Sequence, residues 1–242
     1  MSDQGPRYAI YFAPGADDPL WRFGSQCIGY DAQTGADIEV PQTAAIPRQD
    51  WLAWTQEPRR YGFHGTLKAP FHLAAGASEG ELIDSMAQFA SARTTFWLPD
   101  IDVRAISQFV AITPLTPKDE LQDLARDCVT AFDRFRAPPD EADLARRLSS
   151  PLSARQLELL DAWGYPYVME QFRFHMTLTS SLPDAERAMV VAEISQRFRD
   201  EVGRTDLLID GFALFRQDTR QSRFRIMKRF AFSPENETPA QP

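Results

Sequence analysis

Cysteine is scarce in this chain, with two residues in 242. Cys27 and Cys128 have no Cys-x-x-Cys or Cys-His spacing, so the sequence disfavours a disulfide framework and a zinc site and predicts two small buried side chains. Long hydrophobic runs are also lacking. No window approaches the roughly 18 apolar residues of a membrane helix, and the first residues lead into a short strand pattern rather than a signal peptide. We therefore expect a cytoplasmic protein with no membrane partner.

Positive charge is in deficit, because the formal net charge is -8 at pH 7. An acidic chain lacks the general basic field with which proteins hold long nucleic acids. Basic residues are nevertheless concentrated in 212–232, which contains six Arg or Lys and one Asp, and near Arg59, Arg60 and Lys68. This distribution favours a small phosphorylated substrate as the partner and makes RNA a less favoured one. The oligomeric state stays open.

Histidine is scarce as well, and two of the three histidines belong to a repeat. His64 and His175 lie in matching Phe-His-x-Thr-Leu segments, at residues 63–67 and 174–178. Side chains of a strand alternate between two faces, so each histidine shares a face with Thr66 or Thr177, two residues later. The Phe and Leu of each segment fall on the opposite, apolar face. One such segment would be an ordinary half-buried strand, but two copies indicate a duplicated site.

Two histidines on either side of a phosphodiester can divide the work of hydrolysis. Neutral imidazole accepts a proton and imidazolium donates one, and an ordinary pKa near 6.5 makes both forms available around neutrality. One histidine would act as general base and the other as general acid, while the threonine hydroxyls donate hydrogen bonds to phosphate oxygens. The sequence leaves open which histidine is the base. This scheme requires no metal and no cofactor.

These motifs resemble those of the two-histidine (2H) phosphoesterases, which carry two H-x-[TS]-x motifs on related strands. The segments at 7–14, 60–64 and 171–175 are similar to a branch of that superfamily encoded beside phosphonate-degradation genes. The resemblance covers about residues 7–232. It implies an α+β fold, duplicated and two-lobed, with mainly antiparallel sheets, flanking helices and a central cleft. It also implies catalytic roles for His64 and His175 and phosphate-binding roles for Thr66 and Thr177.

Further candidates surround the two motifs. Lys68, two residues after Thr66, and Arg173, two residues before His175, share the face parity of these motif residues and are candidate phosphate contacts. A solvent-facing lysine and a surface ion pair are the ordinary alternatives for these two. Weaker candidates for substrate binding, each with a packing or surface alternative, are Tyr8, Tyr61, Arg223 and Arg225. His72 lacks a threonine two residues later, and we expect a structural role for it.

The pattern of apolar residues divides the chain into parts that we expect to form one domain. We predict an N-terminal lobe over 1–136, a helical insertion or linker over 137–163, a C-terminal lobe over 164–232 and a disordered tail over 233–242. In each lobe the motif strand is followed by a helix and then by two strands. Pseudo-symmetric packing of two such units would place the histidine faces across a cleft.

The sequence is compatible with three functions. The first is a metal-independent phosphodiesterase acting on a small cyclic phosphate, such as 5-phosphoribosyl 1,2-cyclic phosphate in phosphonate catabolism. The second is a 2',3'-cyclic nucleotide phosphodiesterase or an enzyme similar to an RNA-end ligase. The third is a non-catalytic protein that binds a nucleotide or sugar phosphate. Paired His-x-Thr motifs favour an enzyme, because phosphate binding alone calls for cations more than for titratable bases.

Overall fold

The structure, a computed structural model, describes residues 5–149 and 151–234 and confirms an α+β fold. Most of the predicted tail 233–242 lies outside the described residues. The helices are α1 Pro19–Ile28, α2 Arg48–Trp54, α3 Gln56–Tyr61, α4 Glu79–Ser91, α5 Asp119–Ala131, α6 Glu141–Leu148, α7 Ala154–Trp163 and α8 Asp184–Glu201, with short 3-10 turns at Asp133–Phe135 and Met169–Gln171. The strands are β1 Arg7–Phe12, β2 Tyr30–Asp31, β3 Ala36–Asp37, β4 Gly65–His72, β5 Phe96–Leu98, β6 Ile101–Ile106, β7 Phe109–Pro114, β8 Met176–Thr177, β9 Leu207–Ile209, β10 Gly211–Gln217 and β11 Arg225–Ala231.

A seven-stranded antiparallel sheet contains both motif strands. Its order is β11-β10-β1-β4-β8-β7-β6. The unit that follows each motif strand is a helix and then a hairpin, as the sequence predicts: β4 leads to α4 and β6-β7, and β8 leads to α8 and β10-β11. The hairpins are exchanged, because β6-β7 lies beside β8 while β10-β11 lies on the β4 side. The strands on either side of the β4-β8 pair, in the order of the sheet, therefore come from both halves of the sequence.

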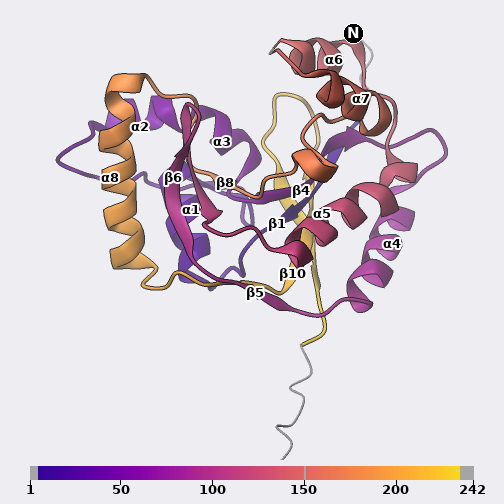
Figure 1. The fold of residues 1–242 in the computed structure, drawn as a ribbon, viewed down its shortest axis with the longest axis horizontal. Coiled ribbons are helices and arrows are strands. Elements are labelled where there is room, and N and C mark those ends of the chain that lie inside the picture. Colours follow the sequence, from indigo (N-terminus) through magenta and orange to yellow (C-terminus); the bar gives the residue numbers. More distant parts are fainter. Residues whose placement is uncertain (1–4, 150, 235–242) are drawn as a thin grey trace, which may run out of the picture.

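The helices α4 and α8 are exchanged in the same way, because each packs against the hairpin from the other half of the sequence. Helix α8 packs against β6 and β7, whereas α4 packs against β10 and β11 and α5 packs against β4. In Figure 1 these two groups stand on opposite sides of the central strands, and α6 and α7 stand together above the α5 side. The largest group of buried apolar side chains spans both groups and contains many phenylalanines, including Phe63 and Phe174 of the repeated motifs. Burial of this apolar area is the main stabilising contribution.

Local signals determine several helix ends. Ser78 and Glu81 form a capping box at the start of α4, and Ser153 and Gln156 form another at the start of α7. Gly164 ends α7 in the left-handed region, with φ of 71°. β5 and β6 are separate strands, because Asp100 between them has a φ of 54°.

The helices of the described segments are all too short or too polar to cross a bilayer. The insertion predicted at 137–163 contains α6 and α7.

Candidate active site

The two repeated segments meet in the middle of the sheet. Strands β4 and β8 are antiparallel neighbours in which Gly65 pairs with Met176, so the histidine that precedes each strand lies next to the other motif. A side chain at Gly65 would collide with the Phe174 ring, since a Cβ there would lie 2.4 Å from it. The glycine thus allows the two motifs to approach each other closely.

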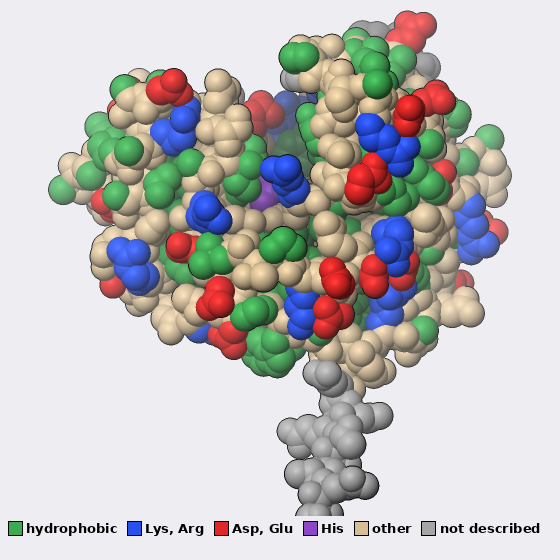
Figure 2. Space-filling view, viewed as in Figure 1, with side chains coloured by type: hydrophobic (Ala, Val, Ile, Leu, Met, Phe, Trp, Pro, Cys, Tyr) green, Lys and Arg blue, Asp and Glu red, His purple; other side chains and the backbone are tan. Residues whose placement is uncertain are grey.

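The motif side chains line one hollow of about 230 Å³. We call it the histidine hollow, and Figure 2 shows the surface hollowed between the two sides of the molecule, with a histidine visible inside. The convergence that the repeat predicts is therefore present in the structure. The residues that line the histidine hollow are Tyr11, Glu57, Pro58, Tyr61, His64, Thr66, Ala69, Pro70, Arg146, Arg147, Tyr165, His175, Thr177 and Thr179.

Backbone carbonyls fix the same tautomer in both histidines. Nδ1 of His64 lies 2.8 Å from the carbonyl oxygen of Gly62, and Nδ1 of His175 lies 2.8 Å from that of Arg173. A carbonyl oxygen can only accept, so each Nδ1 donates and each Nε2 of the neutral ring carries a lone pair. The Nε2 of His64 lies 3.2 Å from the hydroxyl of Thr66. Each motif therefore presents an unprotonated ring nitrogen with a threonine hydroxyl on the same strand.

Burial favours the neutral form of both imidazoles in the free protein. Desolvation lowers the pKa of His64 from 6.5 to about 4, and the nearby His175 acts in the same direction, against the hydrogen bond to Gly62. The fully buried Tyr11 ring stacks on His64, with centroids 3.7 Å apart and planes inclined by 20°. Burial also lowers the pKa of His175. Neutral imidazoles near neutral pH are the form that a general base requires.

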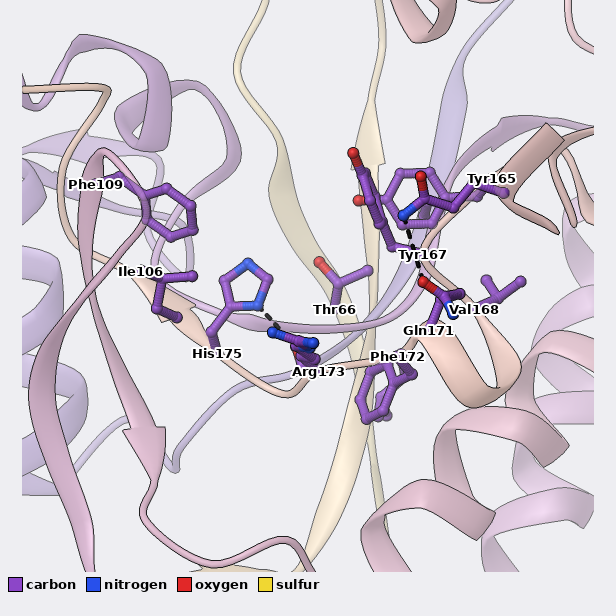
Figure 3. A pocket seen from close by; sticks show the side chains of 13 residues that line it. Thr66, Ile106, Phe109, Tyr165, Tyr167, Val168, Gln171, Phe172, Arg173 and His175 are labelled. Carbon is purple, nitrogen blue, oxygen red and sulfur yellow. Dashed lines mark hydrogen bonds between the residues drawn. The ribbon is translucent and has the colours of Figure 1, made fainter. Parts of the chain in front are cut away.

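A larger space of about 500 Å³ continues from the histidine hollow, and we call it the aromatic compartment. Thr66, Ala69, Tyr165 and His175 line both spaces. In Figure 3, Ile106 and Phe109 lie on one side of His175, and Tyr165 and Tyr167 lie on the other. The remaining lining residues are Leu67, Gln156, Val168, Gln171, Phe172 and Arg173, with a 3.3 Å hydrogen bond from Gln156 to Gln171.

Three arginines bring positive charge to the two spaces. Arg146 and Arg147 of α6 line the histidine hollow, and the exposed Arg173 lines the aromatic compartment, as its proposed role in binding an anion requires. Among the residues that the structure describes, Arg147 and Arg173 form no ion pair with a carboxylate. Unpaired guanidinium groups at a concave site favour an anionic ligand.

Lys68 lines neither space, so the prediction that it shares the face of Thr66 is wrong. Five steps of β4, from Thr66 to Phe71, are matched by three steps of β1, so the strand bulges twice and its alternation is lost. Ala69 lines the histidine hollow, where the alternation of side chains along the strand predicted Lys68. The Lys68 ammonium is buried and donates to the carbonyl of Val129 at 3.0 Å and to Asp133 at 3.1 Å.

Of the four weaker candidates, Tyr61 alone lines the histidine hollow, and its ring also stacks on Phe224. The Tyr8 hydroxyl donates to Glu79 at 2.7 Å, outside both spaces. Arg223 pairs with Asp37, and Arg225 donates to the carbonyl of Thr34 at 3.0 Å. These three side chains have partners within the fold, and neither Arg223 nor Arg225 of the basic segment 212–232 lines the two spaces.

Sequence reasoning missed Arg146, Arg147, Tyr165 and Tyr167. Arg146 and Arg147 lie in the predicted insertion 137–163, and Tyr165 and Tyr167 lie just after it, outside the repeated motifs on which the prediction of the site was based. The signals were the basic pair that follows Asp143 in α6 and the Tyr-Pro-Tyr run just before the second motif.

One group of side chains in the described part of the chain has the spacing of a metal site. Ligand atoms of His72, Asp140 and Asp143 lie within 4.8 Å of one another. None of the three lines the two spaces, and Arg220 donates to Asp140 at 2.5 Å and to Asp143 at 3.1 Å. The guanidinium thus supplies the positive charge that a metal ion would bring, and the cluster holds the start of α6.

Comparison with known sequences gives a family and two relatives. A family model described as "Protein of unknown function (DUF1045)" matches residues 66–225. A protein named ribose 1,5-bisphosphate phosphokinase PhnN from Janthinobacterium sp. (strain Marseille) is 37% identical over all of this chain, and one of the same name from Laribacter hongkongensis (strain HLHK9) is 32% identical over 92% of it. The chain spans about half the length of these curated relatives, 54% and 51% respectively.

Solved structures with a similar course of the chain include E. coli LigT complexed with 3'-AMP. It shares 14% identity, a TM-score of 0.43, and coverage of 94% of this chain and 98% of LigT. A conserved protein of unknown function from Agrobacterium tumefaciens shares 12% identity and a TM-score of 0.41 over 95% of this chain and 87% of its own.

Proposed function

The chain belongs to the DUF1045 family, and we propose that this member is a phosphodiesterase that hydrolyses a small cyclic phosphate by paired-histidine acid and base catalysis. One observation carries the proposal. Two imidazoles with unprotonated Nε2 atoms, each with a threonine hydroxyl on its own strand, line a single hollow. Packing alone does not explain why two histidines line the same hollow.

The proposed reaction divides between the two rings. Nε2 of His64 removes a proton from water, because its low pKa keeps it neutral, and the oxygen of that water forms a bond to phosphorus. His175, protonated when the anionic substrate is bound, gives its proton to the departing ester oxygen. Thr66 and Thr177 donate hydrogen bonds to the non-bridging oxygens, where negative charge develops. No step in this scheme passes through a metal ion.

The substrate that we favour is 5-phosphoribosyl 1,2-cyclic phosphate, in phosphonate catabolism. Water attacks the phosphorus of the cyclic phosphate and displaces the oxygen on carbon 2 of the ribose. The phosphate then remains on the oxygen of carbon 1, and the product is ribose 1,5-bisphosphate. Both curated relatives carry the name of a kinase for that compound. The match supports a phosphorylated ribose as the ligand of this chain.

The aromatic compartment favours a second candidate, a 2',3'-cyclic nucleotide. Phe109, Tyr165 and Tyr167 line a space that would accept a planar base by stacking. Extended RNA is less favoured, because the chain is acidic overall.

Turnover on a small substrate panel tests the proposal. Wild type and His64→Ala would be assayed on 5-phosphoribosyl 1,2-cyclic phosphate, 2',3'-cyclic nucleotides and a short RNA, with a chelator present. We expect hydrolysis of the ribosyl substrate that persists in chelator and falls by about 10² to 10⁴ in the variant. Turnover of nucleotides alone would select the second candidate. Binding without turnover on the whole panel would contradict an enzyme and indicate a receptor.

A further inference from the structure

Helix α6 places a cation in the histidine hollow although it belongs to neither motif. Arg147 lines this hollow together with His64 and His175. Its guanidinium carbon lies over the Tyr165 ring, 4.4 Å from the ring centroid. A cation–π contact with a ring face uses none of the guanidinium N–H groups as a conventional donor, so they can still donate to an anion. In residues 5–149 and 151–234, Arg147 has no carboxylate partner.

The other charges that line the hollow are already paired. Arg146 donates to Asp143 at 2.7 Å, and Glu57 lies 3.9 Å from Arg60. Arg147 therefore contributes an uncompensated positive charge to a space whose remaining lining is neutral or apolar. A cation beside neutral walls attracts an anion more strongly than one in open water.

The position of Arg147 is set by contacts at the start of its helix. Asp140 caps α6 by accepting from the amide of Asp143 at 2.6 Å. Arg220, from the turn between β10 and β11, donates to both carboxylates, and Arg7 of β1 lies 3.7 Å from Asp143. These ion pairs attach α6 to the same sheet that carries the histidines. The guanidinium is thus held in a defined place relative to the motif side chains.

We propose that Arg147 binds a second phosphate of the substrate, so the substrate class is a cyclic phosphate that also carries a phosphomonoester. This inference rests on the proposed function. The motif histidines and threonines supply the donors and acceptors that the reacting phosphodiester needs. A guanidinium fork from a separate element matches the planar pair of oxygens of a phosphomonoester, whose double negative charge calls for a cation.

The test pairs substrates that differ by one phosphate. The pairs are 5-phosphoribosyl 1,2-cyclic phosphate with ribose 1,2-cyclic phosphate, and 2',3'-cyclic AMP with and without a 5'-phosphate. Wild type would be compared with Arg147→Gln and with Arg155→Gln. Arg155 is a matched control, because it lies in the same inserted segment, pairs with Glu158 and Glu170, and lines neither space.

We expect wild type to have a kcat/KM about 10 to 100 times higher on the member with the extra phosphate of at least one pair. Arg147→Gln should lose that preference through KM and change activity on the other member less than about threefold, whereas Arg155→Gln should match wild type. Equal losses on both members, or no preference in wild type, would overturn the assignment while leaving the phosphodiesterase intact.

Absence of turnover by wild type on every substrate would instead contradict the proposed function. Calorimetric binding of ribose 1,5-bisphosphate and ribose 1-phosphate would then decide the role of Arg147. A loss of affinity in Arg147→Gln that is confined to the bisphosphate supports the assignment, and equal affinities in wild type and the variant overturn it.

Discussion

His64 should make the stability of the protein depend on pH. Its pKa in the folded protein is about 4, below the ordinary 6.5 that it regains on unfolding. As the pH falls below 6.5, the unfolded chain binds a proton before the folded one, so stability present above 6.5 is lost toward pH 4. At pH 5 the loss from this residue amounts to about 2 kcal/mol, from a full shift of about 3 kcal/mol.

Urea unfolding at pH 8.0, 6.5 and 5.0 measures this contribution when wild type is compared with His64→Gln. Glutamine does not titrate, and His72 and His175 are present in both proteins, so their contributions largely cancel in the difference. The gap in unfolding free energy between wild type and variant should shift by about 2 kcal/mol, against wild type, between pH 8.0 and 5.0. A gap that stays constant within about 0.5 kcal/mol would refute a half-buried His64 that is neutral in the folded protein.

Three further outcomes follow from the same contacts. Lys68→Met should lower the unfolding free energy by roughly 2–4 kcal/mol, because it removes the donor to the Val129 carbonyl and a partner of Asp133. The kcat/KM of this variant should hardly change. A large loss of activity at normal stability would argue against a structural role for Lys68. Gly65→Ala should cost roughly 1–3 kcal/mol in urea unfolding because of the collision with Phe174, and unchanged stability would contradict that close approach. The profile of kcat/KM against pH should be bell-shaped, with its alkaline limb below pH 6.5, since burial lowers the pKa of His175; a limb above pH 7 would contradict this.

The repeated motif and its architecture could be predicted because they depend on local patterns. The capping box of Ser78 and Glu81 indicates the start of α4, and alternation assigns Phe63 and Phe174 to the core. The exchange of hairpins between the two halves could not be predicted. Alternation tells which face of a strand is buried and carries no information about which strand lies beside it.

The parts of the site that were missed depend on contacts between distant residues. Lys68 lies outside the histidine hollow because β4 bulges against β1. Pro70 in β4 is a local signal of a bulge, because proline cannot donate to the ladder of a central strand, but it does not indicate where the Lys68 side chain lies. Arg147 lines the same hollow as the histidines because Arg220, 77 residues after Asp143 and 80 after Asp140, holds the start of α6. An isolated helix pattern cannot indicate such an anchor.

The most direct test of the central claim is the rate of cyclic phosphate hydrolysis by His64→Ala, His175→Ala and the double variant. If the histidines act as one acid and base pair, each single variant should lose about 10² to 10⁴ in kcat, and the double variant should be little worse than either single one. Either single variant that keeps a tenth or more of the wild-type rate, while folded, would contradict the paired mechanism.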